Sequence, residues 1–122
     1  MKILCPISVG ELLDKISILI VKKDKFQDKR KRDECEKELL ILAPLVNGEL
    51  SKELEQLVLI NRKLYDAREK QFNLIENTAA DNEVTNYLPI INEIHSLNKN
   101  RYKIRSELNK KYESEFIDQK SF

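Results

Sequence analysis

The stretch Ser8-Val-Gly-Glu-Leu-Leu-Asp-Lys-Ile-Ser-Ile-Leu-Ile20 decides the fold. It opens with a capping box, in which the Ser8 hydroxyl accepts a hydrogen bond from the Glu11 amide while the Glu11 carboxylate reaches back to Ser8. Apolar side chains then recur at steps of three and four residues, which draws one apolar stripe along a helix. The stripe consists of Val9, Leu12, Leu13, Ile16, Leu19 and Ile20. The sequence therefore predicts a buried first helix that begins at Val9.

The segments on either side of this helix are less regular. Residues 2–7 are mostly apolar and contain Pro6, which disfavours helix at the preceding residue, so we expect an extended segment and consider an edge strand. Residues 27–32 are polar and predict either a continuous solvated helix or a brief break near Asp28. A second helix should follow from about residue 30 to 42.

The middle of the chain predicts a reversal followed by a long helix. Pro44 and the Asn47-Gly48 pair interrupt the helical pattern, because Pro lacks an amide donor and Gly accepts left-handed backbone. Apolar residues at roughly heptad spacing then predict one helix over residues 49–77. The small polar residues 78–82 predict a second reversal.

A last helix is expected to end at Tyr112, and its start has two alternatives. It begins at Glu83, or it begins near Pro89, because Pro is favoured in the first turn of a helix. The tail, residues 113–122, carries apolar side chains and is expected to dock on the helices. These patterns predict an all-α fold for residues 1–122 as a single domain, in which long antiparallel helices form a helical hairpin or a three- to four-helix bundle.

Composition narrows the classes of function. The 122 residues include 22 basic and 21 acidic side chains, so the formal charge of +1 provides no general attraction to nucleic acid. No apolar run of 18 residues predicts a membrane span. Cys5 and Cys35 lack partners at metal-ligand spacing, so we expect reduced thiols, a cytoplasmic protein, and neither a metal nor a cofactor.

A repeated pattern marks the two long helices. Asn61-x3-Tyr65-x2-Arg68 is matched 37 residues later by Asn98-x3-Tyr102-x2-Arg105. Each Asn stands where the heptad favours Leu, and a buried amide without partners costs about 1–3 kcal/mol. One interpretation is that the two Asn residues fix helix register or oligomeric state.

The other interpretation is an anion-binding pocket. Arg guanidinium groups present a rigid fork that suits phosphate or carboxylate. The pocket would combine five side chains, namely Asn61, Arg68, Asn98, Arg101 and Arg105.

A second polar cluster lies on the first helix and consists of Glu11, Asp14 and Lys15. Glu11 and Asp14 are three residues apart and share a helix face, so the two carboxylates could hold Mg²⁺ or act as acid and base. The capping role of Glu11 favours a structural interpretation instead. No catalytic residue is identified.

The segment Pro6-Ile-Ser-Val-Gly-Glu-Leu-Leu-Asp-Lys-Ile16 resembles the amino-terminal signature of a family of short bacterial proteins defined only as a domain of unknown function. Asn98-x2-Arg101 with Asn109, and residues 115–122, are similar to two further blocks of that family. The chain departs from the family pattern at Ile20, where an acidic residue is usual, and at Tyr65, where Trp is usual. The resemblance implies a small helical bacterial protein, sometimes encoded beside glycan or lipopolysaccharide assembly genes.

Two functions follow from these features. The leading hypothesis is a non-enzymatic module that forms homo-oligomers or binds a protein partner, because its helices are long and amphipathic. The rival is a small-molecule binder or enzyme that uses the Asn and Arg side chains to hold an anionic metabolite such as an activated sugar. Whether the protein is an enzyme is left open by the sequence.

Overall fold

The computed structural model describes residues 1, 3–46, 48–77 and 87–112, and this part of the chain contains helices and no strand. Its four α-helices are α1 (Val9–Lys25), α2 (Lys29–Leu42), α3 (Ser51–Asn77) and α4 (Leu88–Lys111). Two short 3-10 helices, η1 (Ala43–Leu45) and η2 (Gly48–Leu50), connect α2 to α3. The predicted all-α fold of long antiparallel helices is confirmed. Residues 3–8 form no strand, so the edge strand does not form.

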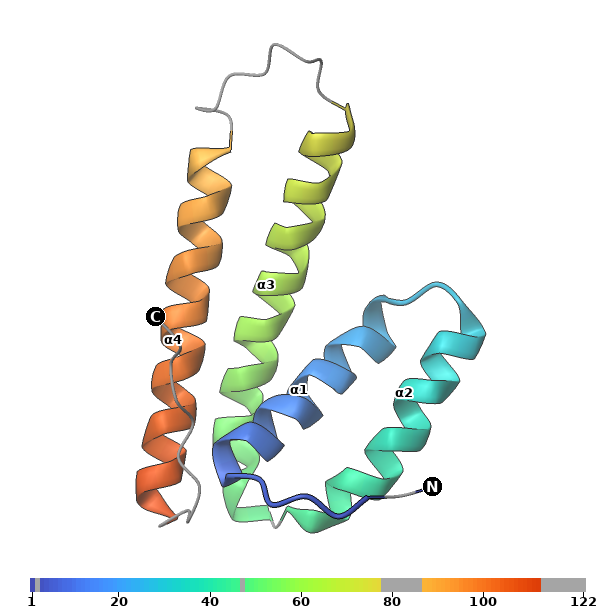
Figure 1. The fold of residues 1–122 in the computed structure, drawn as a ribbon, viewed down its shortest axis with the longest axis vertical. Coiled ribbons are helices and arrows are strands. Elements are labelled where there is room, and N and C mark those ends of the chain that lie inside the picture. Colours follow the sequence, from blue (N-terminus) through green and yellow to red (C-terminus); the bar gives the residue numbers. More distant parts are fainter. Residues whose placement is uncertain (2, 47, 78–86, 113–122) are drawn as a thin grey trace.

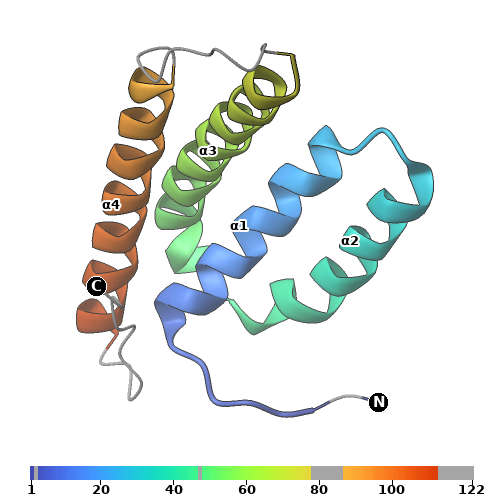
Figure 2. The ribbon, with the colours of Figure 1, turned by 45° about the horizontal axis from the view of Figure 1, so that its top comes forward.

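The helices are arranged as two hairpins of unequal length. The long helices α3 and α4 pack side by side and antiparallel, and the shorter α1–α2 hairpin leans across the end of this pair nearest to η2 (Figure 1). The second view shows α1 between α2 and the long pair, in contact with all three other helices (Figure 2). The opposite halves of α3 and α4 extend beyond α1. Helix α1 is therefore the centre of the packing.

Local signals place the helix starts. The Ser8 hydroxyl accepts from the Glu11 amide at 3.1 Å, as the capping box predicts. Asp28 caps α2 by accepting from the Arg30 amide at 2.8 Å, so the chain breaks between α1 and α2. Helix α4 begins at Leu88, with Pro89 in its first turn, which confirms the later of the two expected starts.

The core lies where α1 crosses the long pair. Leu13, Leu50, Leu57 and Leu108 form one buried cluster, which draws a side chain from α1, from η2, from α3 and from α4. Each buried Leu contributes roughly 1.5–3 kcal/mol relative to exposure, so this crossing holds the hairpins together.

Several expectations are not addressed by this part of the chain. The second reversal at residues 78–82 and the docking of residues 113–122 lie outside the described residues. Cys5 is exposed and Cys35 is buried, and both are free thiols. Within the described ranges, no helix combines the length and apolar character needed to cross a bilayer.

Candidate functional site

A buried carboxylate, that of Asp14, lies at the centre of the helix crossing. It belongs to the predicted polar cluster on α1, yet it lies on the buried side of that helix and is 3% exposed. Burying an ionised carboxylate is costly unless opposite charges and hydrogen-bond donors surround it. The surroundings of Asp14 are therefore the first place to look for a functional site.

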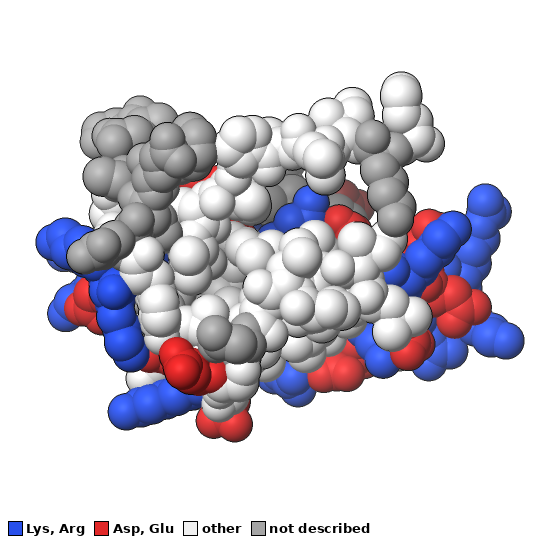
Figure 3. All heavy atoms as spheres, turned by 90° about the horizontal axis from the view of Figure 1, so that it is seen from below, with Lys and Arg blue, Asp and Glu red and all other residues white. Residues whose placement is uncertain are grey.

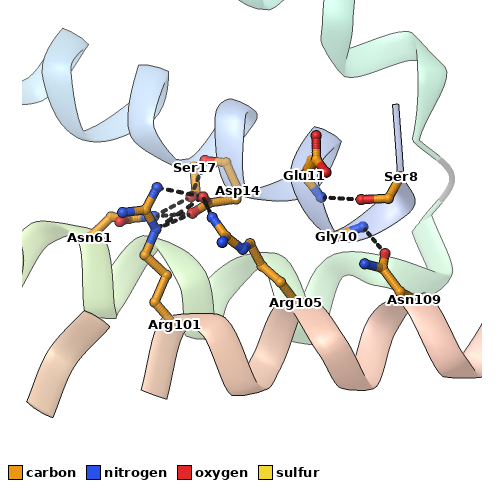
Figure 4. A network of polar contacts seen from close by, with 9 residues as sticks. All are labelled: Ser8, Gly10, Glu11, Asp14, Ser17, Asn61, Arg101, Arg105 and Asn109. Carbon is orange, nitrogen blue, oxygen red and sulfur yellow. Dashed lines mark hydrogen bonds and ion pairs between the residues drawn. The ribbon is translucent and has the colours of Figure 1, made fainter. Parts of the chain in front are cut away.

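Two Arg side chains from α4 converge on this carboxylate (Figure 4). Arg101 donates from Nε to Asp14 Oδ1 at 2.9 Å and from Nη2 to Oδ2 at 2.6 Å, a two-pronged contact. Arg105 donates from Nη1 to Asp14 Oδ2 at 2.9 Å. Both Arg side chains are less than one-fifth exposed. The three side chains together carry one net positive charge.

Helix α3 completes the site with an amide. Asn61 is buried and donates from Nδ2 to Asp14 Oδ1 at 2.8 Å and to Ser17 Oγ at 2.7 Å. The Ser17 hydroxyl in turn donates to the Asp14 backbone carbonyl at 2.6 Å. Because these hydrogen bonds join α1 to both α3 and α4, the cluster fixes the positions of α3 and α4 along α1.

The donors keep Asp14 ionised. Burial on its own would raise the pKa of the carboxyl group, but hydrogen bonds from Arg101 and Asn61, the charge of Arg101 and the hydrogen bond from Arg105 outweigh this effect. The pKa of Asp14 consequently lies below its ordinary value of 3.8. At neutral pH the cluster thus keeps one negative and two positive charges.

A close helix contact lies one turn away from the cluster. The Gly10 amide donates to Asn109 Oδ1 at 2.7 Å, which ties the start of α1 to the end of α4 (Figure 4). A Cβ atom on Gly10 would lie 2.6 Å from the Arg105 carbonyl oxygen, far inside contact distance. Glycine is needed here because the two backbones approach so closely.

The structure brings together three of the five residues predicted for the anion pocket. Asn61, Arg101 and Arg105 meet, but the oxyanion they hold is Asp14. Arg68 is exposed and lies on the wall of a neighbouring cavity, and Asn98 is half-buried and does not line that cavity.

The three residues of the predicted α1 cluster line one pocket, but each has different contacts. Asp14 is held as described, the Glu11 amide completes the cap, and exposed Lys15 pairs with Glu38 of α2 at 3.2 Å. Among the described residues, no group of three or more His, Cys, Asp or Glu side chains is placed to hold a metal ion.

Sequence reasoning missed Ser17 and Gly10 as parts of the site. Ser17 interrupts the apolar stripe three residues after Asp14, and this spacing places both side chains on one helix face. A polar pair at helical spacing inside an apolar stripe is a signal that could have identified it.

A cavity of about 530 Å³ opens beside the cluster, between the second half of α1 and the two long helices. Three cationic side chains line it, namely Lys22, Arg68 and Arg101, with Glu69 as the acidic member of the lining. The remaining lining residues are Ile18, Val21, Asn61, Tyr65 and Phe72. The cavity thus combines a positively charged wall with apolar and aromatic surface, the usual composition of a small-molecule site.

Comparison of the chain with protein-family models, with curated proteins and with solved structures gives no match.

Proposed function

We propose that the protein binds a small molecule with a phosphate or carboxylate group, in the cavity between α1, α3 and α4. The observation that supports this proposal is the excess of positive charge on the cavity wall. Lys22, Arg68 and Arg101 outnumber Glu69 there, although the whole chain is almost neutral. A partly enclosed site with this charge attracts anions more strongly than the exposed surface does.

Arg101 is the residue best prepared to receive the anion. Its Nε and Nη2 groups donate to Asp14, which holds the guanidinium in place at the cavity wall. The guanidinium carries five N–H donors in all, and its contacts with Asp14 use Nε and Nη2. The proposal assigns Nη1 to a ligand oxygen. Because Asp14 already fixes the side chain, binding loses less rotamer entropy than it would with a mobile Arg.

The apolar part of the cavity suits the body of such a ligand. Tyr65 and Phe72 project from α3, and Ile18 and Val21 project from α1. An aromatic or aliphatic group between these side chains would leave water while its anionic end contacts the cations. The proposed ligand therefore has one anionic end and one less polar end.

Calorimetric titration with phenyl phosphate tests the proposal. The informative variant is Arg68→Gln, because Arg68 is exposed and its replacement spares the Asp14 cluster. One charge-assisted hydrogen bond contributes about 1.5–3 kcal/mol, so we expect affinity to fall at least about tenfold. Lys70→Gln is the matched control, since it removes the same charge from an exposed position of α3 outside the cavity lining.

Two results would contradict the proposal. One is the absence of saturable binding of phenyl phosphate to the parent protein. The other is an equal loss of affinity in the two variants, which would mean that only general charge matters.

Self-association is a second candidate, and a different surface favours it. Viewed from below, the molecule presents a broad uncharged area with Lys, Arg, Asp and Glu mostly at its margins (Figure 3). The N-terminal segment, the end of α2 and η1 meet at this end of the molecule (Figure 1). Their exposed apolar side chains are Ile3, Leu4, Ile7, Leu40, Ile41 and Leu45. We call these six residues the underside patch.

The occupant that suits the underside patch is a second copy of the chain. An uncharged surface is matched by another uncharged surface, and a two-fold pair uses the same patch twice. Light scattering on the eluting protein tests this idea. We expect a dimer that Leu45→Glu dissociates and that Leu59→Glu leaves intact, because Leu59 is similarly exposed but lies on α3. A monomer at several hundred micromolar would contradict this candidate.

A further inference from the structure

The face of α3 that packs on α1 continues beyond the point where α1 ends. Ile75 follows Leu64 by about three helical turns and Leu57 by about five, so all three lie on one face of α3. Leu57 and Leu64 are almost fully buried, whereas Ile75 is 58% exposed. Phe72 repeats the pattern, because it follows buried Asn61 by about three turns and is 61% exposed. In the part of the chain that the structure describes, Phe72 and Ile75 thus stay largely exposed on this face.

Helix α4 runs beside α3 at the same level. The contacts of Asn61 and Arg101 with Asp14, and the ion pair between Glu53 and Lys111, set the antiparallel register of the long helices. With equal rise along both helices, residues 90–92 of α4 lie level with Phe72. Ile91, which is 43% exposed, is one of them. We call Phe72 and Ile75 the upper face.

The upper face is continuous with the proposed binding cavity. Phe72 belongs to both, since it lines the cavity together with Arg68 and Arg101. A molecule whose anionic end contacts these cations would therefore lie with its other end against Phe72 and then Ile75. Arg101 lies at the level of the Asp14 cluster, and Arg68 lies about two helical turns farther along α3. Phe72 and Ile75 lie beyond both cations on α3.

We infer that the ligand is amphiphilic, with a phosphate or carboxylate head in the cavity and a linear apolar tail along the upper face. This inference rests on the proposed function, and it favours an alkyl or similar tail over a hydrophilic sugar. The path from the level of Asn61 to Ile75 is about 21 Å at 1.5 Å per residue. An extended chain advances about 1.2 Å per bond, so a tail on the order of ten carbons covers roughly half of it.

Chain length gives the test. Butyl phosphate and octyl phosphate share a head and differ by four methylenes, and a fully buried methylene contributes roughly fourfold in affinity. Because the upper face is open on one side, we expect about twofold per methylene, so octyl phosphate should bind on the order of tenfold more tightly. Both are titrated into the full chain below their micelle-forming concentrations, and octanoate tests whether a carboxylate head serves as well.

A surface variant locates the tail. Ile75→Gln should lower the ratio of octyl to butyl affinity several-fold, whereas Leu59→Gln should leave the ratio unchanged, because Leu59 is 54% exposed but lies outside the upper face. Equal affinity for butyl and octyl phosphate in the parent protein would overturn the inference while the proposed function stands. An Ile75→Gln variant with the same ratio of octyl to butyl affinity as the parent would overturn it too. If neither phosphate binds saturably, the proposed function fails as well.

Discussion

Replacement of Asp14 by Asn tests how strongly the buried cluster holds the two hairpins together. The change keeps the shape of the side chain but removes its charge. Asn keeps only one of the two acceptor oxygens, and its NH2 group would face groups that also donate. Either the contacts with Oδ1 or the contacts with Oδ2 are therefore lost. The Arg101 guanidinium, which is less than one-fifth exposed, would then lose the carboxylate charge that pairs with it.

The magnitude follows from the burial of these groups. Removing one partner of a buried ion pair costs about 3–5 kcal/mol, because the other charge stays buried. A domain of this size is stable by about 5–15 kcal/mol in total, so Asp14→Asn should lose a large share of it. With an unfolding entropy of about 2.1 cal/mol/K per residue, the midpoint of thermal unfolding should fall by roughly 12–20 °C.

Urea unfolding followed by far-ultraviolet circular dichroism measures this loss. The matched control is Asp24→Asn, which removes the same charge from α1 but breaks an exposed ion pair with Arg62 at 2.8 Å. Exposed pairs contribute about 0–1 kcal/mol, so the control should remain close to the parent. Equal losses in the two variants would refute the reasoning, because Asp14 would then act as an ordinary surface carboxylate.

Three further predictions concern the same framework. The difference in unfolding free energy between the parent and Asp14→Asn should be constant above about pH 5 and should shrink as the pH falls below 3.8. The reason is that the pKa of Asp14 is lower in the folded protein, so its stabilising contribution is complete above the unfolded pKa and is lost as the folded carboxyl group takes up a proton. Urea titrations from pH 2.5 to 6 would show this, and a difference independent of pH would contradict it. Gly10→Ala should destabilise the protein by about 2 kcal/mol or more, because its Cβ would meet the Arg105 carbonyl oxygen. This loss should outweigh the helix propensity of Ala, which favours the variant by about 1 kcal/mol. A more stable variant in thermal denaturation would show that α1 and α4 are not in contact there. Ser8→Ala should cost about 1 kcal/mol through loss of the N-cap of α1, whereas Ser8→Gly should cost only a few tenths of that. Chemical denaturation that ranks the two variants in the opposite order would argue against the cap.

The helices themselves could be predicted because their signals are local. The capping box at Ser8, the polar break at Asp28 and Pro89 each act within one or two turns of the chain, and each marks a helix start in the structure. The burial of Asn61 could also be anticipated, because an amide interrupts an apolar stripe there.

The partner of the Arg side chains could not be predicted from local patterns. Asp14 meets Arg101 and Arg105 across a helix crossing, and about 90 residues separate them along the chain. Periodicity shows which face of a helix is buried, but it does not show which residue of another helix lies opposite. A carboxylate and two guanidinium groups on buried faces therefore gave no sign that they belong to one cluster.

The repeated Asn, Tyr and Arg pattern was misleading for a geometric reason. In antiparallel helices two copies of a pattern run in opposite directions. When one residue of the first copy lies level with the second copy, the other residues of the two copies lie apart. Asn61 lies level with Arg101, and from there Arg68 and Arg105 lie in opposite directions along the hairpin. Arg105 reaches the crossing with α1, whereas Arg68 lies beyond Asp14 on the cavity wall. Equal spacing in the sequence thus led to unequal surroundings.

The most direct measurement is a nuclear magnetic resonance titration of the labelled protein with phenyl phosphate, following backbone amides and Arg Nε groups. Binding in the cavity predicts saturable shifts centred on Arg68, Arg101 and Tyr65, with the Arg105 Nε group less affected. Shifts that do not saturate, or that centre on the basic residues 29–32 at the start of α2, would show that the cavity between α1, α3 and α4 is not an anion site.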